Sequence, residues 1–127
     1  MSKKIIFTSA APAPIGPYSQ AVMVGDTLYV SGQIPIDPAT GALVNGTIED
    51  EARQVMLNIG AILKEAGLDF TNVVKTGIFL KDMNNFAKVN EVYGQFFTDQ
   101  YPARETVEVA RLPKDVNVEI SVIAVKD

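Results

Sequence analysis

A run of apolar residues at helical spacing, between residues 47 and 67, limits the possible folds more than any other part of the sequence. Thr47 is a capping residue followed by acids that favour the positive end of a helix, and Gly67 is a typical helix terminator. A second such run follows Asp82, another capping residue. Two amphipathic helices need a sheet to cover, so a fold that combines helices with a sheet is predicted. The apolar positions are Ala52, Val55, Met56, Ile59, Ile62, Leu63 and Ala66, then Phe86, Val89, Tyr93, Phe96 and Phe97.

The strands of that sheet are indicated by Val- and Ile-rich segments. Residues 20–24 and 27–33 flank Gly25-Asp26, a pattern typical of a tight β-hairpin. The other expected strands are 3–8, 73–80, 104–110 and 116–125, whereas 11–19 and 35–46 are rich in Pro and Gly and are expected to be loops. The order β-ββ-α-β-α-β-β predicts an α+β fold, with residues 1–127 forming a single domain.

Alternation divides the strand residues into two sets, one for each face of the sheet. The apolar set is expected to face the helices, and the mixed set is expected on the opposite face. Tyr29, Phe79, Ile123 and Val125 also fall on that opposite face, so we expect it to be partly buried against other copies of the chain, in a homo-oligomer. The apolar set is Leu28, Val30, Val107, Val109, Val118, Ile120 and Val122; the mixed set includes Ser31, Gln33, Arg104, Thr106, Glu108, Asn117, Glu119 and Ser121.

Composition excludes several classes of protein. The chain has no Cys and no His, which excludes disulfides and thiolate or imidazole metal sites and is typical of a cytoplasmic protein. The net charge of −4, with scattered basic residues, disfavours nucleic-acid binding. No segment approaches the roughly 18 apolar residues that span a membrane. The lysines near the N-terminus are not followed by the long apolar stretch of a signal peptide.

Arg104 and Glu119 are the strongest candidates for chemistry. Arginine offers a planar fork of donors that matches a carboxylate. A partly buried Glu119 could hold a water or move its proton. Each has a simpler interpretation: Arg104 as a solvated strand-end residue or an ion-pair partner of Glu105 or Glu108, and Glu119 as a partner of Arg104 or an exposed strand residue. Because alternation places Arg104, Glu119 and Ser31 on one face, we expect them to converge.

Three further stretches are candidates for lining a pocket. Tyr18 follows the rigid Gly16-Pro17 pair and can wall a pocket or simply pack its loop. Gly32, after Ser31, can let a ligand approach the backbone or can mark a bulge. Asn90, on the apolar side of the second predicted helix, is interpreted as bracing a loop.

Five stretches together resemble the Rid family of reactive intermediate deaminases, also called YjgF. The resemblance runs from about residue 10 to 125 and is carried by "PAPIGPYSQAV", "YVSGQIPIDPATG", "VVKTGIFLKDMNNFAKVNEVYGQFF", "YPAR" and "VEVARLPKDVNVEI". It points to the subgroup that hydrolyses 2-iminobutanoate and 2-iminopropanoate. It implies a chorismate-mutase-like fold, in which a mixed sheet carries two helices on one face. It also implies a homotrimer with clefts between subunits, and a reaction that needs no metal or cofactor.

The resemblance also implies roles for individual residues. Arg104 would grip the substrate carboxylate, and Glu119 would place the attacking water. Tyr18, Ser31, Gly32 and Asn90 would line the cleft. Many members have Ser-Cys where this chain has Glu105-Thr106; Thr106 keeps the backbone N–H that serves the ligand, and the alternation predicts that Glu105 points away from it.

Other functions fit the same sequence. One is a non-enzymatic trimer that binds small carboxylates and reports on metabolites through the same arginine. Another is an endoribonuclease or translation inhibitor, which the acidic charge and the lack of His disfavour.

Overall fold

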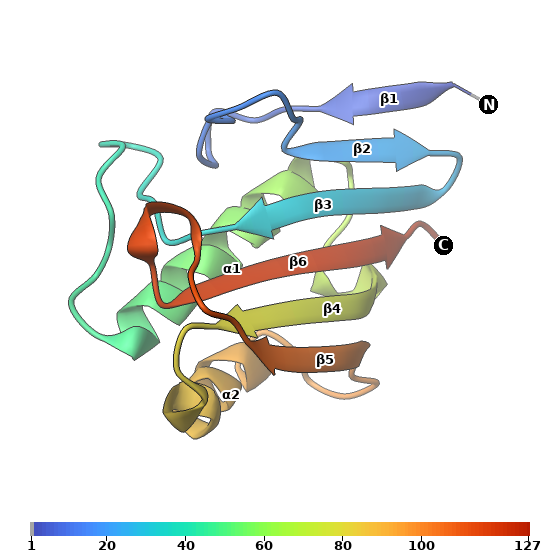
Figure 1. Cartoon of the computed structure of the whole chain (residues 1–127). Helices are drawn as coiled ribbons and strands as arrows, with labels where there is room; N and C mark the ends of the chain where they lie inside the picture. The colour runs from blue at the N-terminus through green and yellow to red at the C-terminus, as the bar shows by residue number, and fades with distance from the viewer. Residues whose placement is uncertain (1) are drawn as a thin grey trace.

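The computed structural model describes residues 2–127 and consists of a six-stranded sheet with two helices packed on one face (Figure 1). The strand order is β1-β2-β3-β6-β4-β5, and only the β4–β5 pair is parallel. The predicted α+β class with a mixed sheet is thereby confirmed. The strands are β1 (Lys3–Ile6), β2 (Ala21–Val24), β3 (Thr27–Gln33), β4 (Val73–Leu80), β5 (Ala103–Glu108) and β6 (Val118–Val125); the helices are α1 (Ile48–Glu65) and α2 (Phe86–Gly94).

Helix α1 begins and ends where its capping residues predict. The Thr47 side chain accepts a hydrogen bond from the backbone N–H of Asp50 at 3.1 Å, which satisfies one of the free donors of the first turn. Gly67, just past the helix, has φ of +78°, a conformation that glycine adopts without steric cost. The apolar stripe between them is buried against the sheet, except that Ala66 at its end is half-buried.

Helix α2 is shorter than the apolar spacing predicts. Asp82 caps a 3₁₀ turn over Met83–Asn85 that precedes the helix, and the helix ends at Gly94. Beyond Gly94 the backbone tightens, because Phe96 and Phe97 bond to carbonyls three residues back and not four. The two phenylalanines therefore pack on Phe70 from a turn and not from a helix.

The parallel register between β4 and β5 reverses the expected orientation of β5. Thr76 pairs with Arg104 and Ile78 pairs with Thr106. Thr76 and Ile78 are buried under the helices, so Arg104 and Thr106 lie on the helix-covered face. The assignment of Val107 to that face was wrong: it is 41% exposed on the other side.

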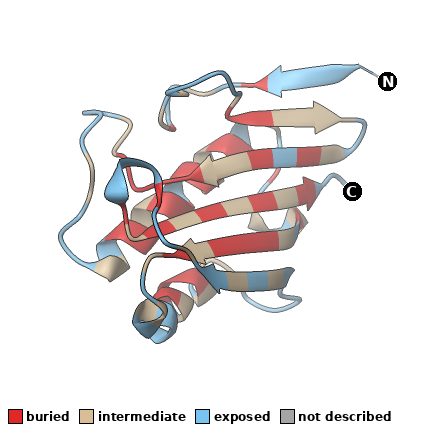
Figure 2. Ribbon diagram, in the orientation of Figure 1, coloured by how far each residue is buried: buried red, intermediate tan, exposed pale blue. Residues whose placement is uncertain are grey.

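Val109, expected under the helices, also lies elsewhere. It packs beyond β5 against a small second apolar cluster formed by Ile34, Ile36, Leu112 and Val116. The remaining members of the predicted apolar set are buried in the main core, which occupies the space between the sheet and the helices (Figure 2). These members are Leu28, Val30, Val118, Ile120 and Val122.

The face without helices keeps large apolar side chains exposed. Tyr29 is 50% exposed and Val125 is 37% exposed, while Ile123 and Phe79 are half-buried. Figure 2 shows the two edge strands, β1 and β5, largely free of buried residues. The homo-oligomer expected from this face stays a prediction. Within residues 2–127 no helix is long and apolar enough to cross a membrane.

Candidate functional site

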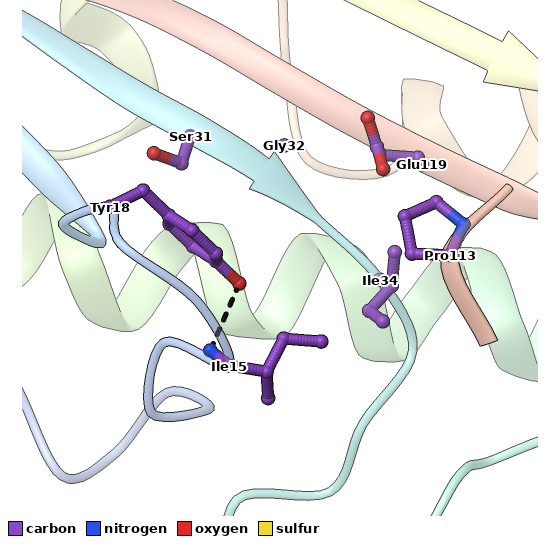
Figure 3. A pocket seen from close by; sticks show the side chains of 7 residues that line it. All are labelled: Ile15, Tyr18, Ser31, Gly32, Ile34, Pro113 and Glu119. Atoms are coloured by element: carbon purple, nitrogen blue, oxygen red, sulfur yellow. Dashed lines mark hydrogen bonds between the residues drawn. The ribbon is translucent and has the colours of Figure 1, made fainter.

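The predicted site residues fall into two groups on opposite faces of the sheet. Tyr18, Ser31, Gly32 and Glu119 line one cavity of about 330 Å³ together with Ile15, Ile34 and Pro113 (Figure 3). We call this group the Glu119 half. Four of the predicted residues are thus brought together. Arg104, which we expected beside them, is absent from this cavity.

The loop that carries Tyr18 is held by a buried side chain. The Gln20 amide nitrogen donates to the carbonyls of Thr8, Ala11 and Pro12, and its oxygen accepts from the N–H of Thr8 at 2.8 Å. The Tyr18 hydroxyl accepts from the N–H of Ile15 at 3.3 Å (Figure 3). The stiffness expected from the prolines is therefore reinforced by hydrogen bonds.

Ser31 fastens the end of that loop to β3. Its hydroxyl donates to the carbonyl of Ser19 at 2.6 Å, and its N–H donates to the carbonyl of Gln20 at 2.9 Å. The Ser31 hydroxyl is thereby already engaged by the chain. Ser31 lines the cavity, and its contact with the loop explains how Tyr18 comes to lie beside the end of β3.

Gly32 lies where the carboxyl group of Glu119 rests on the backbone. The β3–β6 register is irregular between Val30 and Gln33, as the bulge interpretation of Gly32 predicts. A Cβ atom on Gly32 would lie 2.5 Å from Glu119 Oε2, closer than real contacts allow. Glycine is required here so that the Glu119 carboxyl group can occupy its position.

Glu119 itself has no charged partner. Among residues 2–127, the ion pairs are Lys75–Glu105 and Lys81–Asp115, and neither includes it. Burial raises the pKa of the Glu119 carboxyl group above its ordinary value. A carboxyl group with this environment can take up or release a proton closer to neutral pH than an exposed one.

Arg104 lies on the other face, in a second cavity of about 370 Å³ lined by Asn90, Tyr93, Gly94, Tyr101 and Pro102. We call this group the Arg104 half. The expectation that Arg104, Glu119 and Ser31 converge within one chain is wrong. On β4, Phe79 pairs with Glu119 of β6, whereas its neighbour Ile78 pairs with Thr106 of β5. Because neighbouring side chains of a strand point to opposite faces, Glu119 lies on one face of the sheet, and Thr106 and Arg104 lie on the other.

The ion-pair interpretation of Arg104 also fails within residues 2–127. Glu105 points to the other face and pairs with Lys75 at 3.3 Å, and the Glu108 carboxylate accepts from the N–H of Met83 at 2.8 Å. Glu105 therefore points away from Arg104, as its place in the alternation predicts. The Arg104 guanidinium instead lies over the rings of Phe86 and Tyr93, at 5.6 and 5.1 Å from their centroids.

Asn90 and Thr106 belong to the Arg104 half. Asn90 is half-buried and lines the cavity with Arg104. Thr106 is two residues along the same face of β5, and its hydroxyl is buried with no hydrogen-bond partner. The cavity thus offers an unpaired guanidinium, and an unsatisfied hydroxyl lies on the same face next to it.

Sequence reasoning did not identify the roles of the flanking residues. Phe86 and Tyr93 were assigned only to the apolar stripe of the second helix, although their seven-residue spacing places them on one face. Ile15, Ile34 and Pro113 were not singled out at all. Their contribution depends on loops meeting beside Glu119, for which the sequence carries no local signal.

Comparisons with known proteins match this chain along nearly its whole length. The family model described as Endoribonuclease L-PSP matches residues 8–126. A RutC family protein of Pyrococcus horikoshii is 57% identical, covering 98% of this chain and 99% of the relative. A 2-iminobutanoate/2-iminopropanoate deaminase of Bos taurus is 56% identical, covering 98% and 90%.

A solved structure gives the same relationship in three dimensions. The crystal structure of Escherichia coli TdcF with bound serine superposes with a TM-score of 0.94 at 47% identity, covering 98% of this chain and 99% of that one. The sequence resemblance is confirmed, and this chain belongs to the Endoribonuclease L-PSP family, the group also known as YjgF, RutC or Rid.

Proposed function

We propose that the protein hydrolyses 2-imino acids to 2-keto acids and ammonia, in clefts between subunits of a homotrimer. The observation that carries the proposal is the separation of an unpaired arginine and an unpaired, partly buried carboxyl group onto opposite faces of one sheet. Neither half contains both a carboxylate anchor and a proton acceptor. A cleft formed by the Arg104 half of one copy and the Glu119 half of another would contain both.

The family relatives favour this substrate class. The Bos taurus relative carries the name of a deaminase acting on 2-iminobutanoate and 2-iminopropanoate, and the TdcF structure holds serine. Serine and the imino acids share a carboxylate next to a carbon that bears nitrogen. An arginine free of acidic partners is the group that recognises such a carboxylate through two parallel hydrogen bonds.

In the proposed reaction Arg104 fixes the substrate by its carboxylate, which orients the neighbouring iminium carbon. Glu119, as a carboxylate, accepts a proton from a water as the water oxygen bonds to that carbon. The proton then passes to the nitrogen of the tetrahedral adduct. The carbon–nitrogen bond breaks and ammonia leaves while the Glu119 carboxylate takes the proton of the remaining hydroxyl group, which gives the 2-keto acid.

The other site residues would shape the cleft. Tyr18, Ile15 and Ile34 present apolar surface beside Glu119, which suits a short aliphatic substrate side chain. The backbone of Gly32 lies against the carboxyl group that handles the water. Asn90 and Thr106 would add polar contacts next to Arg104. These roles need no metal or cofactor, and no nucleic acid or membrane partner.

A coupled assay tests the proposal. A pyridoxal-dependent threonine dehydratase generates 2-iminobutanoate in the cuvette, and semicarbazide competes for it. We expect wild-type protein to lower the semicarbazone signal, and Arg104→Ala to lose about 30-fold or more in rate, because a charge-assisted bidentate contact contributes about 2–4 kcal/mol. A wild-type trimer that leaves the signal unchanged but binds 2-oxobutanoate would replace the deaminase with a carboxylate sensor. RNA cleavage abolished by Glu119→Gln would point to an endoribonuclease instead.

A further inference from the structure

The arginine of the Arg104 half is held by aromatic rings and not by acids. Its guanidinium carbon lies 5.6 Å from the centroid of Phe86 and 5.1 Å from that of Tyr93. The two rings are seven residues apart on α2, so they project from the same side of the helix over β5. Arginine stacks on aromatic faces through both its charge and its plane.

The Tyr93 ring is fixed to the same point of the sheet as the arginine. Tyr93 is 5% exposed, and its hydroxyl donates to Thr76 Oγ1 at 3.0 Å. Thr76 is the register partner of Arg104 across the parallel β4–β5 pair. Burial raises the pKa of the Tyr93 phenol, which keeps it protonated and able to donate.

A chain of rings supports Tyr93 from behind. Phe97 packs on Tyr93 with centroids 4.8 Å apart, and Phe70 packs edge-on to Phe97 at 5.6 Å. Phe70 in turn lies against Gly60 of α1, where a Cβ atom would come within 3.1 Å of the ring. Tyr93 is therefore packed between the core and Arg104, while Phe86, 39% exposed, completes the outer side.

This arrangement orients the arginine without neutralising it. In most ion pairs a carboxylate both positions the guanidinium and occupies its N–H donors. Within residues 2–127 the Arg104 guanidinium has no ion pair, and its cavity is lined by no acid. Ring faces contact the plane of the guanidinium, so the N–H edge stays open to an incoming anion.

We propose that Phe86 and Tyr93 are positioning residues that hold the Arg104 guanidinium ready for the substrate carboxylate. The inference rests on the proposed function in assigning a carboxylate to Arg104. It adds that the affinity of the site depends on two aromatic faces. It also follows that lysine cannot replace Arg104, since an ammonium group has no plane to stack between rings.

The test compares ring-removing variants with a matched control. Phe86→Leu and Tyr93→Leu remove a face from Arg104, whereas Phe96→Leu removes a ring that packs on Phe70 and does not line the Arg104 cavity. Tyr93→Phe keeps the ring but loses the bond to Thr76. Titration calorimetry with 2-oxobutanoate gives Kd, the dehydratase-coupled assay gives kcat and KM, and thermal unfolding reports folding.

We expect Phe86→Leu and Tyr93→Leu to raise Kd and KM about fivefold each with kcat within about twofold, because a cation–π contact is lost and the arginine is less ordered. Phe96→Leu is expected to leave Kd unchanged. The Kd of Tyr93→Phe is expected to lie between those of the two ring-removing variants and that of the control. Phe86 is partly exposed, so its variant keeps the test valid even if Tyr93→Leu fails to fold.

Two results would overturn the inference. One is a Kd for Phe86→Leu equal to that of the Phe96→Leu control. The other is a wild-type protein that binds no 2-oxobutanoate. By contrast, wild-type binding without acceleration of imine hydrolysis would overturn only the deaminase proposal, and the ring dependence of Kd would still support or overturn the positioning role.

Discussion

The Glu119 half and the Arg104 half of the candidate site are built in different ways. The Glu119 half lies where a hydrogen-bonded loop meets a strand irregularity, and its surroundings are mainly aliphatic. The Arg104 half lies on an edge strand under the second helix, and its surroundings are mainly aromatic. Aliphatic burial favours the neutral form of an acid, whereas aromatic faces tolerate a cation.

The separation of the two halves preserves their reactivity. On one face of one chain, a guanidinium and a carboxylate within reach would pair and occupy each other's bonding groups. Here the sheet lies between them, so Arg104 keeps free donors and Glu119 keeps a raised pKa. A substrate that needs both must bind where one copy of the chain meets another, which makes assembly a condition for activity under the proposed function.

Removing the proton acceptor, Glu119, should change the kinetic constants differently from removing the carboxylate anchor, Arg104. We expect Glu119→Gln to lower kcat about 100-fold with little change in KM, because general base catalysis contributes about 10²–10⁴-fold. Arg104→Ala, in contrast, should raise KM as well. Steady-state kinetics in the coupled assay measures this. Equal effects of the two variants on KM would contradict the division of roles.

Mixing two inactive variants tests whether the halves meet across a subunit boundary. The Arg104→Ala and Glu119→Gln proteins are unfolded together at equal concentration and refolded. A mixed trimer with clefts between subunits has one cleft with both groups intact, so the mixture should recover about a quarter of wild-type activity. Each variant refolded alone is the control. No recovery in mixed trimers of native size would rule out the shared cleft.

A single methyl group should disturb the Glu119 half and leave the Arg104 half intact. Gly32→Ala forces the Glu119 carboxyl group to move, because the new Cβ would lie 2.5 Å from Oε2. We expect kcat to fall about tenfold, since misplacing a catalytic group by about an ångström can cost up to 10²-fold. Binding of 2-oxobutanoate through Arg104 should change less than turnover.

Gly46→Ala is the control for this variant, because its Cβ would have ordinary contacts, the nearest at 3.4 Å from Asp50 Oδ2, and Gly46 lines neither cavity. Equal kcat values for the two glycine variants would show that the Gly32–Glu119 contact is unimportant.

The smallest expected effect is a displacement of the acid limb of the pH profile. Glu119 must be ionised to accept a proton, and its raised pKa moves the acid limb of kcat to higher pH than an ordinary carboxyl group would give. Below that pKa, kcat should fall about tenfold per pH unit as the carboxyl group is protonated. A stopped-flow pH series on wild type and Glu119→Gln measures this. An acid limb that persists unchanged in Glu119→Gln would assign it to another group.

Much of the fold could be predicted from the sequence, because the sequence signals for its helix ends and turns are local. The Thr47 cap, the Gly67 terminator and the Gly25-Asp26 turn each depend on neighbouring residues, and all were confirmed. The central strands β3, β4 and β6 were placed within two residues of their observed bounds. Tyr18, Ser31, Gly32 and Glu119 lie around one cavity, whereas Asn90, which the resemblance to the Rid family placed in the same cleft, lies in the Arg104 half.

The orientation of β5 was decided only by tertiary structure. Alternation sorts Arg104 and Thr106 from Glu105 and Val107, but it does not say which set faces the helices. For the central strands hydrophobicity settles this, because one set is strongly apolar. On the edge strand β5 both sets are mixed, so the parallel register with β4 decides, and it places Arg104 beside Thr76 under α2. The sequence therefore determined which side chains are available for chemistry, whereas long-range strand pairing determined on which face each one lies.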